Sequence, residues 1–155
     1  MIISDDIGCN YKPKMIKILI ICRANSCRSQ MAEAILKRLD PDLIVESAGP
    51  EPAEVVHPLT VQAMAEIGID ISQSSTTNIN EFVNKDWDFV ITVCDIAKES
   101  CPAFLGNVKN SIYLKFEDPL AYEGDDEFRL KLIRTTRTQI ITVFEDFYNE
   151  FITSK

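Results

Sequence analysis

Short apolar runs rich in β-branched residues alternate with amphipathic helical segments along most of this chain. Four runs, at residues 16–21, 43–46, 89–93 and 111–114, predict strands. The apolar residues that predict helices are Met31, Ala32, Ile35, Leu36 and Leu39, then Leu59, Ala63, Met64 and Ile67, and finally Phe128, Leu132, Ile140, Val143, Phe144, Phe147 and Phe151. Apolar strands separated by helices form a parallel sheet that helices cover on both faces. The sequence therefore predicts an α/β fold.

The length and composition describe one globular domain. A chain of 155 residues with 46% hydrophobic and 26% charged residues can bury one core. We expect a flexible extension at residues 1–14 and a single domain at residues 15–155. No apolar run reaches the ~20 residues that a membrane span needs. Residues 1–13 lack the basic flank and apolar stretch of a secretory signal, so a cytoplasmic protein is predicted.

The net charge limits the kinds of molecule that this protein can bind, and the cysteines indicate the redox state of its thiols. A net charge of −8 argues against nucleic acid, because no basic stripe is present to neutralise a phosphate backbone. An anionic substrate would have to be attracted by a local site and not by the overall field. Five cysteines in a cytoplasmic chain indicate reduced, reactive thiols more than structural disulfides. We expect a monomer.

Four polar or reactive residues follow the four predicted strands. Cys22 comes after the first strand, Ser47 after the second, Cys94 after the third and Asp118 after the fourth. Ligands of open α/β sheets bind outside the carboxyl ends of the strands. The sequence therefore places its candidate functional residues at one edge of the sheet.

A Cys-x5-Arg segment connects the first strand to the first helix. It reads Cys22-Arg23-Ala24-Asn25-Ser26-Cys27-Arg28-Ser29. Such a turn can direct successive backbone N–H groups inward beside the positive end of the helix, and Asn25 suits a left-handed position within it. Arg28 can grip two oxygens of a tetrahedral oxyanion, and Ser29 can donate a hydrogen bond to the Cys22 sulfur or to a leaving oxygen. The same positive field stabilises the Cys22 thiolate, which predicts a nucleophile inside an anion site.

A plainer interpretation makes Cys22 and Cys27 small buried hydrophobes and puts Arg28 in a surface ion pair. For an isolated Cys-x5-Arg match, that interpretation would be the better one. Here a strand precedes the segment, a helix follows it, and small polar residues lie between. These features together favour the anion site.

Cys94 and Cys101 form a second pair of thiols, separated by six residues. Core packing explains either cysteine alone but explains the pair poorly. Zinc is disfavoured, because the gaps of four and six residues between cysteines miss the usual structural spacings and the chain has one histidine. If residues 94–101 were helical, the two sulfurs would lie about 10 Å apart along the axis, whereas a disulfide needs Cα atoms within about 7 Å. Forming this disulfide would therefore require the segment to rearrange.

Asp118 and His57 are the remaining candidate groups. An Asp-Pro dipeptide such as Asp118-Pro119 is more often only a turn. Its place after the fourth strand favours an acid that protonates a departing oxygen. His57 precedes Pro58, so we interpret it as a residue at a helix start and not as a base. The acidic residues 123–127 are interpreted as a solvated helix start.

These motifs resemble the low-molecular-weight protein tyrosine phosphatase family, and more closely its thioredoxin-coupled arsenate reductase branch. The resemblance runs from about residue 17 to residue 151. Its motifs are Asn25-Ser26-Cys27-Arg28-Ser29-Gln30-Met31-Ala32-Glu33, Ser47-Ala48-Gly49, Ile67-Gly68-Ile69-Asp70-Ile71-Ser72, Ile91-Thr92-Val93-Cys94-Asp95 and Asp118-Pro119. It implies a flavodoxin-like, doubly wound three-layer sandwich with a four-stranded parallel sheet. It also implies that Cys22 is the nucleophile, Arg28 the oxyanion clamp and Asp118 the general acid.

The same resemblance implies an order of thiol chemistry. Cys22 attacks arsenate, Cys94 attacks the Cys22 adduct and releases arsenite, and Cys101 captures Cys94. Thioredoxin then reopens the Cys94–Cys101 disulfide, and no bound cofactor is expected. The backbone of residues 23–29 would bind the oxyanion, with Asn25 and Ser47 supporting the loop.

Some reductases of this branch bind potassium through groups matching Asn25, Glu33 and Ser47. Since Thr77 stands where the family has a carboxylate, we predict no metal. Two loop positions also depart from the family, namely Arg23, where a small or apolar residue is usual, and Ala24, where Gly or His is usual. Arg23 would add positive charge at the rim of the loop, and the Ala24 Cβ would tighten it.

Two other functions stay open from the sequence. Family phosphatases carry paired tyrosines just after Asp-Pro, whereas this chain has Leu120-Ala121 and then Tyr122, which weakens recognition of aryl phosphates without excluding a phosphatase. The other alternative is a non-enzymatic redox sensor whose thiols report oxidants and bind a partner.

Overall fold

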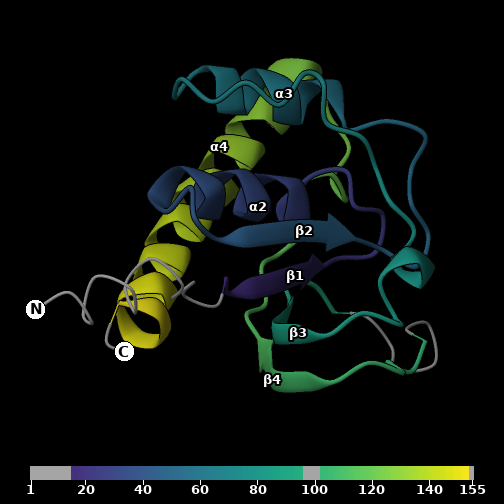
Figure 1. The fold of residues 1–155 in the computed structure, drawn as a ribbon. Coiled ribbons are helices and arrows are strands. Elements are labelled where there is room, and N and C mark those ends of the chain that lie inside the picture. Colours follow the sequence, from purple (N-terminus) through teal and green to yellow (C-terminus); the bar gives the residue numbers. More distant parts are fainter. Residues whose placement is uncertain (1–14, 96–101, 154–155) are drawn as a thin grey trace, which may run out of the picture.

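The computed structural model describes residues 15–95 and 102–153 (Figure 1). Its elements, in chain order, are β1 (Lys17–Ile21), α2 (Arg28–Leu39), β2 (Ile44–Ala48), α3 (Pro58–Ala65), the 3-10 turn η1 (Ile79–Glu81), β3 (Trp87–Thr92), β4 (Val108–Tyr113), α4 (Asp126–Phe147) and the π-helical turn η3 (Tyr148–Ile152). The predicted extension at residues 1–14 lies outside the described residues.

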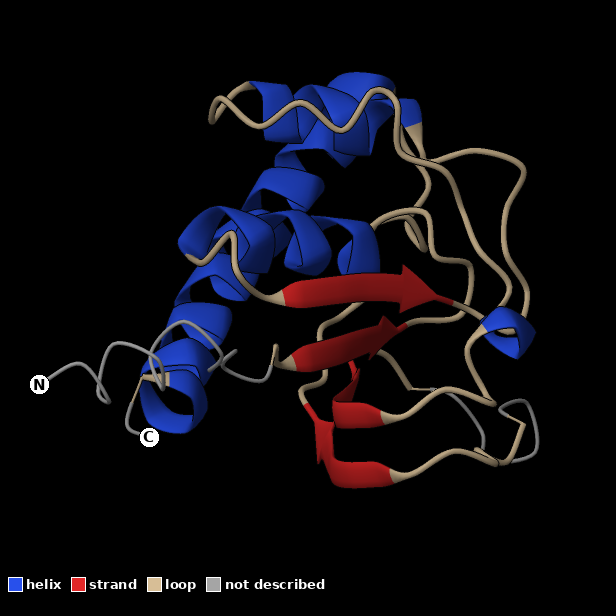
Figure 2. Cartoon of the chain, viewed as in Figure 1, coloured by secondary structure: helices blue, strands red, loops and turns tan. Residues whose placement is uncertain are grey.

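The four strands form one sheet in the order β2-β1-β3-β4, and every pair is parallel (Figure 2). Ile18 of β1 is paired with Val45 of β2 on one side and with Phe89 of β3 on the other. The chain therefore passes from β1 to β2 and then crosses back to the far side of β1. This reversal puts the topological switch point at the carboxyl end of β1, where open α/β sheets bind ligands. The predicted α/β class with a four-stranded parallel sheet is confirmed.

The core has two parts because side chains alternate between the two faces of the sheet. Ile18 and Ile20 of β1 point to one side, where they belong to a core cluster with residues of α2, α3 and α4. Leu19 and Ile21 point to the other side, where they pack with Ile79, Phe82, Trp87 and Val90. In the described ranges, η1 and its flanking segments cover this second face without a long helix.

Helix α3 begins at the predicted residue and ends two residues before Ile67, which the sequence placed within it. The His57 side chain caps it by accepting a hydrogen bond from Leu59 N at 3.1 Å, and Pro58 occupies the first helical position. The helix ends at Ala65, and Gly68 adopts a left-handed φ of 79° just beyond it. The interpretation of His57 as a helix-start residue is confirmed.

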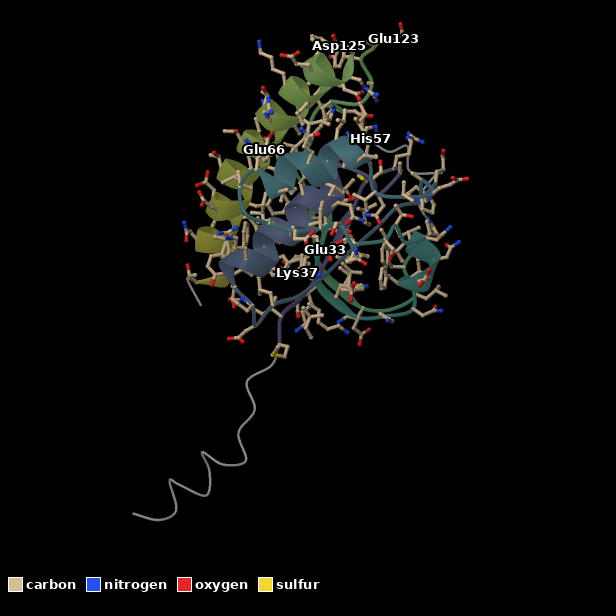
Figure 3. All side chains as sticks on the ribbon, turned by 90° about the horizontal axis from the view of Figure 1, so that it is seen from above. Glu33, Lys37, His57, Glu66, Glu123 and Asp125 are labelled. Carbon is tan, nitrogen blue, oxygen red and sulfur yellow. The ribbon has the colours of Figure 1, made fainter. Side chains whose placement is uncertain are left out.

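Helix α4 is capped by Asp125, whose carboxylate accepts a hydrogen bond from Phe128 N at 2.8 Å. Asp126 and Glu127 occupy its first turn, where negative charge is favoured, so the interpretation of residues 123–127 as a solvated helix start is confirmed. Glu123 and Asp125 lie together at this end of the helix (Figure 3). None of the helices in the described ranges combines the length and apolarity required to cross a membrane.

Candidate active site

The segment between β1 and α2 is a loop whose carbonyl groups are held from outside. Its carbonyls accept hydrogen bonds as follows: Arg23 O from Glu51 N (3.0 Å), Ala24 O from Ala53 N (3.0 Å), Asn25 O from Gln30 Nε2 (3.0 Å), Ser26 O from His57 N (3.0 Å) and Cys27 O from Met31 N (3.0 Å). Residues 49–57 thus form a strap along one side of the loop. In a trans peptide the N–H points away from the carbonyl, so this arrangement directs the loop N–H groups to the opposite, inner side.

The first turn of α2 adds further free N–H groups. Cys27 stands at the N-cap position but makes no capping hydrogen bond through its side chain, and the first turn holds no acidic residue. The first N–H groups of a helix have no partner within the helix, and the helix dipole places partial positive charge there. The loop and the start of α2 together form a concave set of donors suited to a tetrahedral oxyanion.

Gly49 lets the strap approach the loop closely. A Cβ built on Gly49 would lie 2.3 Å from Arg23 O and 2.4 Å from Cys22 O, and both are backbone atoms that cannot move aside cheaply. Glycine at this position is therefore a packing requirement. The sequence analysis quoted Gly49 within a family motif but gave it no role.

Asn25 lies fully buried inside the loop, with a left-handed φ of 52°. Its side-chain amide donates to Ser29 Oγ at 2.8 Å and to Ser47 Oγ at 2.9 Å, and its Oδ1 accepts from Thr77 N at 2.9 Å. The expected left-handed backbone at Asn25 is confirmed. One side chain thus ties the loop to α2, to β2 and to the segment before η1.

Ser29 hydrogen-bonds to the Cys22 sulfur, with 2.9 Å between Oγ and Sγ. Because Asn25 already donates to Ser29 Oγ, the hydroxyl hydrogen of Ser29 is free to point at Cys22. A sulfur that receives this hydrogen is stabilised as the thiolate, which is the nucleophilic form. Both side chains are buried, so water competes little for this bond.

Ser47 lies inside β2 and not after it, because β2 extends to Ala48. The prediction that Ser47 follows the second strand was wrong by two residues, since Glu46 to Ala48 continue the pairing with β1 through Leu19 to Ile21. Ser47 donates to Glu33, and Glu33 also forms an ion pair with Lys37 one turn along α2. Figure 3 shows Glu33 and Lys37 side by side on this helix.

Gln30 is a second support that the sequence analysis missed. It is buried at the start of α2, and its side-chain amide contacts Asn25 O at 3.0 Å and Ser75 O at 3.1 Å. A glutamine among the buried residues of a helix is an unusual choice. That buried polar position was the signal that could have identified it.

The Arg28 side chain is held at the inner edge of the loop by the segment that follows β4. Its Nη1 donates to Phe116 O at 3.0 Å, and Nη2 lies 3.6 Å from Asp118 Oδ2. The Arg28 side chain is 12% exposed and that of Asp118 is 41% exposed. Asp118 Oδ1 also accepts a hydrogen bond from Leu120 N at 2.9 Å, which fixes the turn at Pro119. The structure therefore brings Asp118 next to the anion loop, 90 residues from Arg28 in sequence.

Cys94 lies beside the loop at the end of β3. The β1–β3 ladder continues to Val93, whose N–H donates to Ile21 O at 2.9 Å, so Cys94 comes level with Arg23. Burial and the neighbouring Cys22 together raise the pKa of the Cys94 thiol to about 11, while Arg28 and Arg23 oppose this shift.

Cys27 is buried to the same extent as Cys22 and belongs to the same core cluster. Burial raises the pKa of its thiol to about 12, so it is a thiol and not a thiolate near neutral pH. Its side chain packs in the main core with Met31 and Met64. Within the described ranges, the free thiols at or beside the loop are Cys22, Cys27 and Cys94.

Cys101 and Cys9 lie outside the described residues, and so does most of residues 94–101. The predicted rearrangement of that segment stays a prediction. Across residues 15–95 and 102–153, no three His, Cys, Asp or Glu side chains gather as a metal site requires. The prediction of no metal likewise stays a prediction. Thr77 contributes a backbone N–H to Asn25.

The family model for low molecular weight phosphotyrosine protein phosphatase matches residues 17–142 of this chain, which spans β1 to most of α4. This chain belongs to that family. The resemblance noted from the loop motifs is thereby confirmed for the chain as a whole. The first described strand and the anion loop both fall inside the matched range.

Several proteins similar to this chain carry the name arsenate reductase. The chain is 42% identical to an arsenate reductase of Halalkalibacterium halodurans over 124 residues, covering 79% of this chain and 88% of the relative. A solved structure described as an arsenate reductase in the phosphate binding state is 32% identical, with a TM-score of 0.67, and covers 88% of this chain and 98% of its own. A thioredoxin-dependent arsenate reductase from Corynebacterium glutamicum is 26% identical, with a TM-score of 0.56, covering 89% of this chain and 66% of its own.

Proposed function

We propose that this chain reduces arsenate to arsenite with thiols as the source of electrons. The observation that carries the proposal is the position of Cys94 beside the Cys22 loop, where it comes level with Arg23 across the β1–β3 ladder. A phosphatase of this fold needs one thiolate, an anion cradle and an acid. Reduction by two electrons needs a second thiol within reach of the first.

In the proposed first step, the Cys22 thiolate attacks the arsenic of arsenate bound in the loop. An As–O bond breaks, and the departing oxygen takes a proton from Asp118 and leaves as water. The loop N–H groups and the Arg28 guanidinium hold the remaining oxygens. Ser29 stabilises the Cys22 thiolate before the attack, and Asn25 orients Ser29.

In the proposed second step, the Cys94 thiolate attacks the Cys22 sulfur of the adduct. A Cys22–Cys94 bond forms and the S–As bond breaks, with its electron pair leaving on arsenic as arsenite. Two thiols have then lost the two electrons that arsenic has gained. We propose that Cys101 next attacks Cys94 to free Cys22, and that thioredoxin, acting in the cytoplasm, reduces the Cys94–Cys101 disulfide.

The names of the relatives support this proposal, and the thioredoxin-dependent relative supports the choice of reductant. We also propose that the protein acts as a monomer without a bound cofactor. The domain responsible would span residues 15–155, which include every residue of the proposed relay.

The family match supports a second candidate activity, the hydrolysis of phosphate monoesters through a phosphocysteine. The Cys22 loop, Arg28 and Asp118 would serve that reaction without Cys94. Leu120 and Ala121 stand just after Asp118-Pro119, so the half-exposed Tyr122 is the one aromatic ring offered there to an aryl ester.

Purified protein incubated with arsenate, thioredoxin and thioredoxin reductase should form arsenite over many turnovers. Cys22→Ser should abolish arsenite formation, and Cys101→Ser should limit it to a single turnover. Mass spectrometry after one turnover should find a disulfide that involves Cys94. Turnover of p-nitrophenyl phosphate with no arsenite formed would instead assign the phosphatase activity.

A further inference from the structure

The side-chain amide of Asn25 can point in either of two directions, and only one of them serves Cys22. Turning an amide by half a turn exchanges its oxygen for its NH2, so its hydrogen-bond partners decide the direction. In the structure the two amide hydrogens go to Ser29 and Ser47. In the opposite direction Oδ1 would face Ser29, whose hydroxyl would donate to Asn25 and have no hydrogen left for Cys22. The reactivity of Cys22 therefore depends on the groups that hold the Asn25 amide in its present direction.

Three groups hold the Asn25 amide. Thr77 N donates to Oδ1 at 2.9 Å, and Gln30 Nε2 lies 3.2 Å from the same oxygen. On the NH2 side, Ser47 accepts from Asn25 because its own hydrogen goes to the Glu33 carboxylate. The Thr77 donor belongs to the backbone, so substitution at position 77 leaves it in place. Gln30 is the donor to Oδ1 that a substitution can remove.

Gln30 is itself held in one direction by groups that can only accept. Its Nε2 lies 3.0 Å from Asn25 O and 3.1 Å from Ser75 O, and both are backbone carbonyls. An amide oxygen turned toward these carbonyls would meet no hydrogen, so the NH2 must face them. Gln30 is 3% exposed, so water cannot satisfy the wrong direction. The backbone thus sets the direction of the Gln30 amide.

The hydrogen bonds then run in one sense from Gln30 to Cys22. Gln30 donates to Asn25 Oδ1, and Asn25 Nδ2 donates in turn to Ser29 Oγ at 2.8 Å. Ser29 keeps its own hydrogen for Cys22 Sγ, 2.9 Å away. Every member of this series is buried, so each hydrogen bond is protected from exchange with water.

We infer that Gln30 is a positioning residue for the nucleophile: it holds the Asn25 amide in the direction that leaves the Ser29 hydroxyl to stabilise the Cys22 thiolate. Gln30 does not touch the reacting atoms and acts through Asn25 and Ser29. This inference rests on the nucleophilic role of Cys22 in the proposed function, and it applies equally to reduction of arsenate and to hydrolysis of a phosphate ester.

The first test compares full-length Gln30→Met with wild type. Methionine keeps the length of the side chain and removes the NH2 group. Labelling of Cys22 by iodoacetamide is followed from about pH 6 to about pH 9.5 by peptide mass spectrometry. Gln30→Met should slow this labelling about threefold to tenfold at pH 7, because part of a hydrogen bond to a charged sulfur is lost. The difference should fade toward about pH 9.5, where a thiol ionises without help.

Ile35→Ala is the control for a general loosening of α2. Ile35 is buried on the same helix and belongs to the apolar core. Its loss should change Cys22 labelling by the same factor at every pH, because loosening alters access to the sulfur and not its ionisation. Gln30→Leu serves as a second apolar variant if Gln30→Met does not fold.

A double-mutant cycle with Ser29→Ala tests the path of the effect. Without the Ser29 hydroxyl, the direction of the Asn25 amide no longer matters to Cys22. Gln30→Met should therefore change Cys22 labelling by less than about twofold when Ser29→Ala is already present. Equal slowing in both backgrounds, slowing that is the same at every pH, or unchanged labelling in Gln30→Met would each overturn the role of Gln30.

One equivalent of arsenate separates this role from the proposed function. Gln30→Met should slow arsenite formation in a single turnover at pH 7 by a factor similar to its effect on labelling. Wild-type protein that forms no arsenite, while Gln30→Met still slows labelling as described, would overturn the reductase function and leave the role of Gln30 standing. Arsenite formed at the same rate by Gln30→Met and wild type, with unchanged labelling, would overturn the role of Gln30 alone.

Discussion

The side-chain amide of Asn25 lies 2.8 Å from Ser29 Oγ, and this contact decides which way the Ser29 hydroxyl points. An amide nitrogen only donates, so Ser29 Oγ accepts from Asn25 and keeps its own hydrogen for Cys22 Sγ, 2.9 Å away. The second amide hydrogen of Asn25 goes to Ser47, which donates in turn to Glu33. Each donor in this network has an acceptor, and the network ends on the proposed nucleophile.

Ser29→Ala should therefore lower the reactivity of Cys22. A hydrogen bond to a charged group contributes roughly 1.5–3 kcal/mol, which corresponds to a loss of tenfold or more in reactivity. The rate of Cys22 alkylation by iodoacetate at pH 7, measured by mass spectrometry, checks this. Ser74→Ala, at an exposed serine, is the control and should react like wild type. Equal Cys22 rates in Ser29→Ala and wild type would mean that the hydroxyl does not stabilise the thiolate.

Asn25 combines a hydrogen-bonding role with a backbone role, and two substitutions separate them. Asn25→Gly and Asn25→Ala both remove the amide and should both lower Cys22 reactivity. Asn25→Ala also places a Cβ at a φ of 52° with no side-chain hydrogen bonds to compensate for the strain. The free energy of unfolding should therefore be about 1–2 kcal/mol lower for Asn25→Ala than for Asn25→Gly. Urea unfolding curves check the difference. Equal stabilities of the two variants would contradict the backbone role.

Gly49→Ala should destabilise the fold and disturb the loop together. The new Cβ would lie 2.3 Å from Arg23 O, so the strap or the loop must shift, with an expected loss of about 2 kcal/mol or more. Gly68→Ala is the matched control, because its Cβ would make only an ordinary contact with the Arg38 side chain at 3.6 Å and its cost comes from a φ of 79°, about 1 kcal/mol. Chemical denaturation measures both. A milder effect for Gly49→Ala than for Gly68→Ala would be inconsistent with this close approach.

His57 should make stability depend on pH near neutrality. Burial lowers the pKa of His57, and the nearby Arg129 lowers it further. As the pH falls, the unfolded chain therefore binds the proton first, and the folded state loses stability relative to it. The contribution of neutral His57 is full above about pH 6.5 and is lost as the pH drops through the folded pKa. Protonation at Nδ1 would also remove the acceptor for Leu59 N.

Urea unfolding at pH 7.5, 6.5 and 5.5 measures this dependence. His57→Asn keeps a capping side chain that cannot titrate, so its free energy of unfolding should change less over this range than that of wild type. The same slope in both proteins would show that His57 does not carry the dependence.

Glu66 links the end of α3 to α4, where Figure 3 shows it between the two helices. Arg134 Nε donates to its Oε1 at 2.9 Å, and Arg137 Nη1 lies 2.9 Å from the same carboxylate. The hydrogen bond from Arg134, aided by that from Arg137, lowers the pKa of Glu66 to about 2. A lowered acid pKa contributes stability above about pH 4.3, and this contribution is lost as the pH falls toward 2.

Glu66→Gln should therefore cost about 0.5–1 kcal/mol at pH 7, the range for a partly exposed ion pair with good geometry. The difference from wild type should shrink as the pH falls below 4. Unfolding at pH 7 and pH 3 measures it, with Glu81→Gln, at an exposed residue of η1, as the control. A difference that stays constant with pH would contradict the ionic role of Glu66.

The strands and helices could be predicted from the sequence because their signals are local. Apolar periodicity located β1, β3 and α3 to within two residues and α2 to within three. The strand of weakest pattern, β4, begins at Val108 and not at Ser111, because four of its six residues are exposed and the strand gives little apolar signal. The boundary of β2 was missed for a related reason, since Ser47 is polar yet continues the ladder.

The anion loop could also be predicted, because a strand, a Cys-x5-Arg spacing and a helix are contiguous. The residues that support the loop could not be predicted in the same way. The strap binds the loop carbonyls through the backbone N–H groups of Glu51, Ala53 and His57. Every residue except proline has such a group, so the sequence gives no signal for this contact. Asn25 contacts Ser47, which lies 22 residues away in sequence, and Thr77, which lies 52 residues away. Only the folded sheet brings these residues together.

By itself, the sequence determined the fold class, the loop that presents Cys22, and the approximate places of the main helices, because each depends on residues close together in the chain. Tertiary structure alone decided that Cys94 comes level with Arg23 and that Arg28 meets Asp118. Those outcomes depend on the order of strands in the sheet. That order follows from the joint burial of apolar faces contributed by every element, and no short segment encodes it.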